Sequence, residues 1–570
     1  MAAVLDDLRS TGPLDIGWLS DIDAVVHQAT GVVTVQSSGR GMTGLPRGYP
    51  WQPGPNVHEE GCVMRVGVLD ILAPPARGPA EVGYRLLMTK QFASITPQAI
   101  SVWCRRRGHE TFYATYYGLG DPHRLLPNDL DVVFIACYTQ VSHLAYALAK
   151  LYRRAGVRTV IGGPHAKAFP ADCLRFFDLV VGECDAELVA DILAGQFDPG
   201  SLVSAARPFE DVPTVAERMP EIRASAFFWG RKPLLLSAVP MLASMGCPYQ
   251  CDFCIDWNTR YRPLSPDRLA ADLRYLARHL PGTLIVFHDP NFAVTFDRVL
   301  DVLQALPPGE RPPYIIESSL TVLRKDRPSR LKDTNCVMVA PGVESWTDYS
   351  NKAGVGREGG VAKVDHVADH FAVLADNVPY LQANFMFGLD TDQGDEPVEL
   401  TKRFMDRTPF VWPTINIPVP FGGTPLHDQL TADGRILTTM PFSFYYAPYL
   451  VTTLRHYDPI TYYTKLTELY SHAASRAMLR RRTRTTSHRL IRYVHRARSA
   501  AFRGDIASFH QILGMLRDDP RFLAFHEGRT TNLPDYYHHL GDRMLGRYAE
   551  LLSPAERVPD LTQTLEPRQG

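Results

Sequence analysis

Short apolar runs alternate with segments of helical spacing between residues 65 and 197. The runs are Arg65–Leu72, Thr111–Tyr116, Asp131–Cys137, Arg158–Gly162 and Leu179–Val181. Helical spacing is found near Gln98–Arg107, Ser142–Ala155 and Ala186–Leu193. Strands that alternate with helices in this way predict a parallel sheet covered by helices on both faces. We therefore expect an N-terminal doubly wound, Rossmann-like α/β domain over 65–197.

A second alternation follows a Pro-containing linker, 198–232, and occupies residues 233–430. Its apolar runs are Ser237–Ser244, Thr283–Phe287, Tyr314–Glu317, Cys336–Ala340, Leu381–Phe387 and Thr414–Val419. Helical patterns between them cover Pro266–Leu280, Thr295–Leu306, Val361–Leu374 and Glu396–Asp406. Strands joined by helical crossovers predict a partial (β/α)6 barrel.

The two ends of the chain have a different character. Residues 1–64 are interrupted by Gly and Pro and indicate an N-terminal extension, with short helices expected at 4–8 and 21–28. Residues 431–570 are helical, aromatic and basic, which predicts a helical C-terminal domain. We expect many of its aromatic side chains to form a cap over the barrel, among them Phe442, Phe444, Tyr445, Tyr446, Tyr462, Tyr463, Tyr536 and Tyr537.

Charge is balanced over the 570 residues, with 60 Lys and Arg against 61 Asp and Glu. No overall field therefore attracts nucleic acid or an anionic membrane. One local exception is 476–498, which contains arginines and no acidic residue. Because these arginines wind around a helix instead of forming one stripe, we favour a solvated helix packed across acidic parts of the barrel over a nucleic-acid contact.

The chain carries no pattern for export or membrane insertion. Its first ten residues are acidic, where a secretory signal is basic. The uncharged run 233–251 contains three prolines, which suits a buried strand and loop better than a membrane helix. The nine cysteines are odd in number and mostly scattered, so they do not form a disulfide framework. We expect a cytoplasmic protein whose partners include neither a membrane nor nucleic acid.

Three cysteines stand together directly after the first barrel run, in the sequence GCPYQCDFC. Cys247, Cys251 and Cys254 have the spacing Cys-x3-Cys-x2-Cys. Thiolates bind iron–sulfur clusters, and three of them on one loop leave one iron of a cubane without a protein ligand. The alternative is zinc, which takes four ligands in closed sites, usually from paired Cys-x2-Cys units, and no second pair is present.

The triplet, with Phe253 before its last cysteine, resembles the signature of the radical S-adenosylmethionine (SAM) superfamily. The resemblance implies a [4Fe–4S] cluster whose open iron chelates SAM, and an electron donor such as flavodoxin or ferredoxin. Polar residues at later strand ends outline a pocket, since ligands bind at the C-terminal ends of barrel strands. We expect SAM contacts from Phe253, Asp289, Ser318, Glu344 and Asn384, although each polar residue alone is more often structural.

Small and polar residues also end successive runs of the first domain. They are Tyr138, Thr139, Gln140, Gly162, Gly163, Gly182 and Glu183. Their order resembles the cobalamin-binding domain that precedes the barrel in one large radical SAM subclass, and implies that these residues contact cobalamin. The Asp-x-His-x-x-Gly motif is absent, so the resemblance implies no protein histidine below the cobalt. A dinucleotide fold is the alternative, but no Gly-x-Gly-x-x-Gly follows the first run.

Together these resemblances imply a cobalamin-dependent radical SAM methyltransferase. It would transfer a methyl group from SAM, through methylcobalamin, to a carbon of a small biosynthetic substrate of natural-product or amino-acid type. Radical and polar methyl transfer both stay open. So do a non-methylating enzyme that performs cyclisation, ring contraction or oxidation, and a non-catalytic iron–sulfur and cobalamin regulatory protein. No residue is assigned a catalytic role.

Overall fold

A computed structural model of the chain describes residues 63–88, 93–208, 210–230, 232–233, 237–257, 259–323, 326–350, 353, 358–486, 488–562 and 568–569. The extension expected over 1–64, with its two short helices, lies almost entirely outside the described residues.

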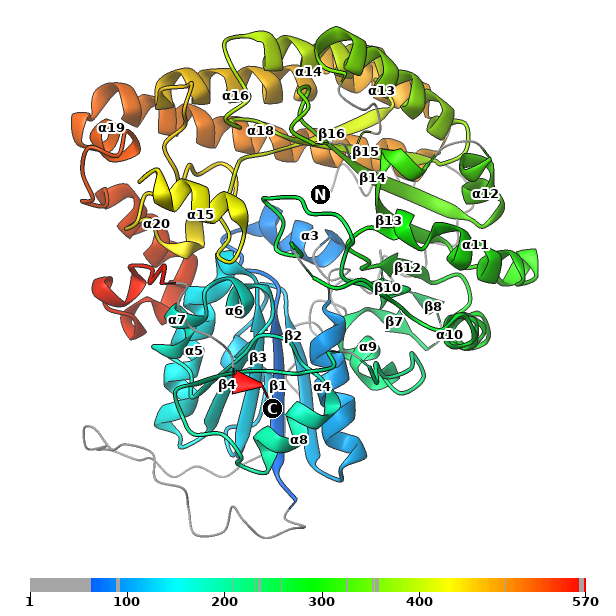
Figure 1. Ribbon diagram of the computed structural model, residues 1–570, viewed down its shortest axis with the longest axis vertical. Coiled ribbons are helices and arrows are strands. Elements are labelled where there is room, and N and C mark those ends of the chain that lie inside the picture. The colour runs from blue at the N-terminus through cyan, green and yellow to red at the C-terminus, as the bar shows by residue number, and fades with distance from the viewer. Residues whose placement is uncertain are drawn as a thin grey trace.

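The first domain is a parallel sheet with helices on both faces (Figure 1). Its strands, in spatial order, are β17 (Arg568–Gln569), β6 (Ser201–Ser204), β5 (Leu179–Val181), β4 (Arg158–Gly162), β3 (Val132–Cys137), β1 (Arg65–Ile71) and β2 (Glu110–Tyr116). Alternate strand residues face opposite sides, so Val66 and Val68 pack with α4 (Ile95–Arg106) and α8 (Ala186–Leu193). Leu69 and Ile71 pack instead with α5 (Ser142–Arg154), α6 (Pro164–Ala168) and α7 (Pro170–Leu174). The doubly wound α/β prediction is confirmed.

The interval 198–232, expected to be a linker, is largely structured. It contains β6, α9 (Met219–Ser225) and the hairpin β7–β8 (Phe228–Trp229, Lys232–Pro233). Strand β6 extends the first sheet beside β5. Four residues with serine at both ends give too short an apolar pattern to be recognised as a strand.

Helix α9 joins the first domain to the barrel through buried polar groups. The Arg218 guanidinium donates to Gln98 Oε1 of α4 at 2.7 Å and to the carbonyl oxygen of Pro240, in the first barrel strand, at 3.3 Å. Ser101 Oγ donates to Glu221 Oε1 at 2.7 Å. We call this set of contacts the α9 joint. It fixes how the barrel sits on the first domain.

The second domain is a six-stranded parallel sheet, as predicted for a partial barrel. Its strands, in order, are β9 (Ala238–Met241), β12 (Leu284–Phe287), β13 (Tyr314–Ser319), β14 (Cys336–Glu344), β15 (Tyr380–Met386) and β16 (Val411–Asn416). The helices that follow them are α10 (Pro266–His279), α11 (Phe296–Gln304), α12 (Arg327–Asp333), α13 (Gly360–Ala375), α14 (Glu396–Arg407) and α15 (Pro425–Ala432). The last strand begins three residues earlier than expected, because an edge strand tolerates Pro413.

The C-terminal region packs against both other domains. Its main helices are α16 (Pro459–Ala474), α17 (Arg476–Thr485), α18 (Arg489–Asp518), α19 (Pro520–His526) and α20 (Asp535–Leu545). One buried cluster combines Phe442 and Tyr462 with Trp412 of the barrel and Phe169 of the first domain. We call this cluster the aromatic joint. Among the described residues, no helix is both long enough and apolar enough to cross a bilayer.

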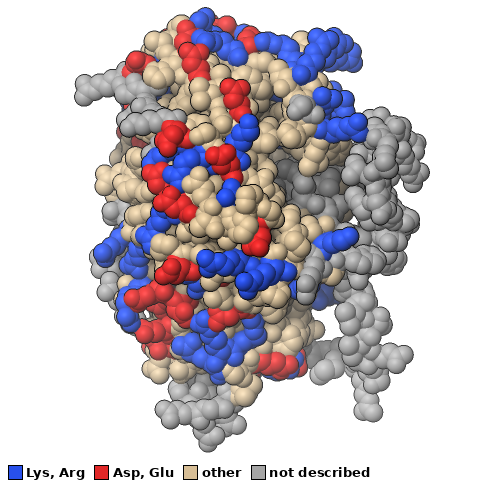
Figure 2. All heavy atoms as spheres, turned by 90° about the vertical axis from the view of Figure 1, so that its right-hand side faces the viewer, with Lys and Arg blue, Asp and Glu red and all other residues tan. Residues whose placement is uncertain are grey.

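Charges of both signs are interspersed on the barrel side of the molecule. Figure 2 shows Lys and Arg side chains among Asp and Glu side chains across this face. Arg330 of α12, for example, pairs with Asp297 and Asp301 of α11. The mixed surface agrees with the balanced composition of the chain.

Candidate functional site

The cysteine triplet lies on a loop closed at its base. Strand β10 (Ser244–Met245) pairs antiparallel with β11 (Arg262–Pro263), so residues 246–261 project as one excursion. Gly246 has φ +64°, and a Cβ there would lie 2.3 Å from the Arg260 carbonyl oxygen. Only glycine fits this approach. The residue before the first cysteine therefore has a structural reason to be glycine.

The three triplet cysteines differ in exposure from the other described cysteines. Cys247, Cys251 and Cys254 are half-buried, whereas Cys104, Cys137, Cys173, Cys184 and Cys336 are buried. Burial raises the pKa of Cys104 and of Cys336 to about 12, so both stay protonated thiols. Among the described cysteines, only the triplet combines access with three thiols on one loop. In residue type and spacing, this donor set suits an iron–sulfur cluster.

Asp289, at the end of the second barrel strand, supports the cysteine loop. Its Oδ2 accepts from the Ala243 amide at 2.9 Å, and its Oδ1 accepts from Ser244 Oγ at 2.6 Å. The side chain is buried, which raises its pKa to about 6. These contacts indicate a role in shaping the start of the loop. The SAM contact that the sequence suggests for Asp289 stays a prediction.

Other predicted SAM-contact residues lie at neighbouring strand ends. Ser318 lies near the end of β13, and Glu344 is the last residue of β14, and both are buried. Glu344 has φ 65°, where residues other than glycine are uncommon, beside a register shift between Gly342 and Glu344. Such a conformation is held by surrounding structure and is frequent at binding sites. The rim of the barrel therefore holds a buried carboxylate residue in an uncommon backbone conformation.

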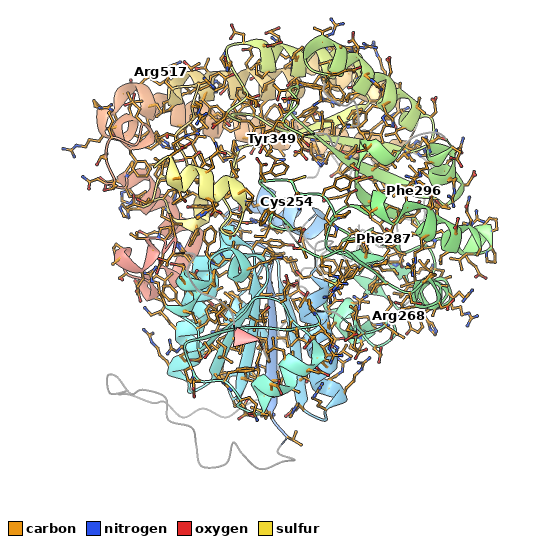
Figure 3. All side chains as sticks on the ribbon, viewed as in Figure 1. Cys254, Arg268, Phe287, Phe296, Tyr349 and Arg517 are labelled. Atoms are coloured by element: carbon orange, nitrogen blue, oxygen red, sulfur yellow. The ribbon has the colours of Figure 1, made fainter. Side chains whose placement is uncertain are left out.

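Phe253 of the cysteine loop stacks on Tyr349, with ring centroids 6.0 Å apart. Tyr349 also donates from its hydroxyl to Asp252 Oδ1 at 2.7 Å. Figure 3 shows Cys254 and Tyr349 together near the centre of the molecule. Tyr349 was not predicted from the sequence, because it follows the fourth strand without any motif around it. It packs the loop against the barrel rim.

The C-terminal edge of the first sheet carries all the residues predicted to contact cobalamin. Tyr138, Thr139 and Gln140 follow β3, Gly162 and Gly163 end β4, and Gly182 and Glu183 follow β5. A Cβ at Gly162 would find its nearest atoms 3.8 Å away, so packing within the chain does not require glycine there. Because glycines have no side chain, the backbone at this edge is accessible to a large, flat ligand. We call this edge, with the seven residues just named, the ledge.

This ledge faces the cysteine loop. Lys167 Nζ lies 3.0 Å from Glu183 Oε1 on the ledge and donates to Thr259 Oγ1 of the cysteine loop at 3.1 Å. In Figure 1 the strands of the first sheet lead toward the barrel mouth. Lys167 therefore links the two predicted cofactor sites across the boundary between the domains.

His165 of α6, three residues after Gly162, is buried in the first domain. Its Nε2 lies 2.5 Å from Tyr146 Oη, which also donates to Asp172. Burial lowers the pKa of His165 to about 3, so the imidazole is neutral. It packs in the core.

The arginines of the basic segment 476–498 are mostly exposed, as expected for a solvated helix, but two of them reach Trp412 of the barrel. Arg482 is fully buried, and its guanidinium carbon lies 4.8 Å from the Trp412 ring centroid. Arg498 lies 4.9 Å from the same centroid. Most of the other arginines are on the surface, where Arg481 pairs with Asp406. Among the described residues, neither Arg482 nor the half-buried Arg498 pairs with a carboxylate.

The family model of the radical SAM superfamily matches residues 241–404. The match spans the cysteine loop and the strands from β12 to β15. Residues 241–404 form a radical SAM domain. The cysteine loop, the strained Glu344 and the interior of β15 all lie within this radical SAM domain.

Two curated relatives extend the likeness beyond the radical SAM domain. The bacteriochlorophyllide d C-8(2)-methyltransferase of Chlorobaculum tepidum is 23% identical over 401 residues, which cover 67% of this chain and 85% of the relative. A protein named an uncharacterized methyltransferase of Pyrococcus horikoshii is 25% identical over 336 residues, 54% of this chain and 71% of the relative.

A solved structure shares the fold. It is the cobalamin-dependent S-adenosylmethionine radical enzyme OxsB with aqua-cobalamin bound, with a TM-score of 0.51 and 12% identity. The match covers 86% of this chain and 80% of that chain. The shared fold therefore extends over most of both chains and is not limited to the radical SAM domain.

Proposed function

We propose that this protein is a cobalamin-dependent radical SAM enzyme that methylates a carbon of a small substrate. The observation that carries the proposal is the pairing of the half-buried cysteine loop with the bare ledge of the first sheet, linked by Lys167. An electron donor such as flavodoxin or ferredoxin would reduce the site in the cytoplasm.

The chain's own residues would bind and orient the reagents. Cys247, Cys251 and Cys254 would ligate the cluster, and the ledge from Tyr138 to Glu183 would hold cobalamin. When bound, these groups would supply reductive cleavage of SAM and carriage of its methyl group. The Glu344 carboxylate suits an ammonium or ribose hydroxyls, and Ser318 and Asn384 suit polar atoms beside it. The domains on either side would exclude water from the bound reagents.

Methyl transfer is favoured because both named relatives are methyltransferases. The test is anaerobic reconstitution followed by incubation with methyl-labelled SAM and extracted metabolites. S-adenosylhomocysteine, 5′-deoxyadenosine and a labelled product together would support radical methylation. S-adenosylhomocysteine with a labelled product and no deoxyadenosine would indicate polar methyl transfer, and deoxyadenosine without a labelled product would contradict methylation.

Iron content tests the cluster separately. Reconstituted protein should hold about four irons, and alanine at Cys247, Cys251 and Cys254 together should abolish that binding. Cys336→Ala, a buried thiol of the same domain, is the matched control and should keep the iron. A triple variant that retains the iron would overturn the cysteine assignment.

Cobalamin retention tests the ledge. Gly162→Ala adds one methyl group that the folded chain accommodates without a clash. We expect the variant to melt at the temperature of the wild type but to retain less cobalamin after gel filtration, because the added methyl group would occupy the surface of the ledge. Unchanged retention would argue against a ligand on Gly162.

A further inference from the structure

Helix α18 of the C-terminal region inserts an arginine into the radical SAM domain. Arg498 Nη1 donates to Gln382 Oε1 at 2.6 Å and to Tyr380 Oη at 2.8 Å, while Nη2 donates to Thr414 Oγ1 at 3.3 Å. These acceptors are neutral side chains of β15 and β16. The Arg498 cation is therefore held by hydrogen bonds to neutral groups and not by a carboxylate.

The alternation of β15 shows that these contacts lie inside the barrel. Leu381, Ala383 and Phe385 belong to the cluster that contains residues of the outer helices α13 and α14. Side chains alternate between the two faces of a strand. Tyr380, Gln382 and Asn384 therefore face the interior.

Arg498 fixes the orientation of the Gln382 amide. A guanidinium only donates hydrogen bonds, so the Gln382 oxygen must face Arg498 and its NH₂ group must point away. That NH₂ group donates to Asn384 Oδ1 at 2.7 Å. Because its oxygen is used by Gln382, the Asn384 amide keeps its own NH₂ group for another partner.

Asn384 is placed to present this NH₂ group at the interior rim of the barrel. It pairs in register with Gly342 of β14, two residues before Glu344, and is half-buried. Glycine at the neighbouring register position places no side chain over it. The donor therefore lies at the interior rim that also carries Glu344.

We propose that Arg498, acting through Gln382, holds Asn384 as a hydrogen-bond donor toward a carboxylate of the bound ligand. Arg498 and Gln382 are positioning residues, and Asn384 is the contact. The proposal rests on the proposed function, since the carboxylate belongs either to the methionine part of SAM or to the substrate.

The decisive pair of variants is Gln382→Glu and Gln382→Met. A glutamate would accept from Arg498 and also from Asn384, which would turn the Asn384 oxygen toward the ligand. Methionine would leave Asn384 free to keep its orientation. We expect the SAM dissociation constant, measured by equilibrium dialysis on reconstituted protein, to rise about tenfold or more with glutamate and about threefold with methionine.

Stability should rank the two variants in the opposite order. The glutamate would pair with Arg498 and keep the thermal midpoint at or above that of the wild type, whereas methionine would remove an acceptor from a cation and lower it. A purely structural role for Gln382 predicts that the less stable variant binds worse. If the more stable Gln382→Glu variant binds SAM more weakly than Gln382→Met, the orientation of the Asn384 amide, and not stability, determines binding.

Arg498 itself is tested with a control from the same helix. Arg498→Met should weaken SAM binding about threefold or more, and Arg498→Lys should restore part of it, since lysine can still donate to Gln382. Arg496→Met changes an exposed arginine two residues away and should leave binding unchanged.

The outcomes separate the sources of the carboxylate. Weaker SAM binding assigns it to SAM. Unchanged SAM binding, with a raised KM for the methyl-accepting metabolite fraction, assigns it to the substrate. If neither the SAM dissociation constant nor the KM changes in folded Gln382→Glu protein, the proposed positioning of Asn384 by Arg498 and Gln382 is refuted. Failure of the proposed function is distinguishable, because the reconstituted wild type would then bind no SAM, which would also overturn this inference.

Discussion

The barrel is joined to its neighbours in two different ways. At the α9 joint, Arg218 is buried and its guanidinium donates to Gln98, Pro213 and Pro240. At the aromatic joint, Arg482 is also buried, but only its Nη1 donates, to the Ala473 carbonyl oxygen, while its Nε and Nη2 have no hydrogen-bond partner among the described residues. The first arginine determines a geometry, whereas the second fills space against Trp412. Equal burial therefore does not imply an equal contribution to the fold.

The largest predicted effect breaks the aromatic joint. Phe169 is fully buried, and its ring centroid lies 4.1 Å from that of Phe442. Phe169→Ala should lower the free energy of unfolding by about 3–5 kcal/mol, because it removes packing and leaves a cavity. Denaturant titration checks this value. A loss below about 1 kcal/mol would mean that the cluster repacks around the cavity.

The second prediction breaks the α9 joint. Arg218→Met would leave the buried oxygens of Gln98 and Pro240 without their donor, and should cost about 2–3 kcal/mol of unfolding free energy. Because this joint sets the placement of the two domains, the ratio of methylated product to 5′-deoxyadenosine should also fall. Lost stability with an unchanged product ratio would contradict the placement role.

The third prediction sharpens the comparison through pH. His526 is buried in the C-terminal region, with Nε2 2.8 Å from Tyr537 Oη, and burial lowers its pKa to about 3. The unfolded state therefore binds the proton at a higher pH than the folded state, so the contribution of this group is lost as pH falls below about 6.5. His526→Gln should flatten this part of the stability profile between pH 6.5 and 4. Parallel profiles for the two proteins would show that His526 is not responsible.

The smallest predicted effect concerns Arg482. Replacing a buried, unpaired cation by an apolar side chain of similar length is often neutral or stabilising. Arg482→Met should therefore change the free energy of unfolding by less than about 1 kcal/mol, in contrast to Arg218→Met. Arg481→Met, which removes an exposed pair with Asp406, is the neighbouring control and should also cost less than about 1 kcal/mol. A large loss with Arg482→Met would show that the hydrogen bond to Ala473 and the contact with Trp412 stabilise the fold by more than burial of the cation costs.

Much of the architecture could be predicted from apolar periodicity. The central strands of the first sheet and all barrel strands were located to within a few residues, since their apolar side chains repeat at a spacing set by burial. Strand β6 and helix α12 were missed because each is short, with a polar or proline-containing pattern. The α9 segment was interpreted as a linker because its function depends on Arg218 and Glu221, which look like surface residues in a sequence.

The sequence alone determined the chemistry that the protein can carry. Cysteine spacing, glycines at strand ends and polar residues at barrel strand ends are local features, and covalent connectivity keeps them together. Only the tertiary structure decided that Asp289 supports the loop, that Tyr349 stacks on Phe253 and that Arg498 reaches Gln382. Those contacts join residues far apart in the chain, and they form only where folding brings separate elements to one place and excludes water from between them.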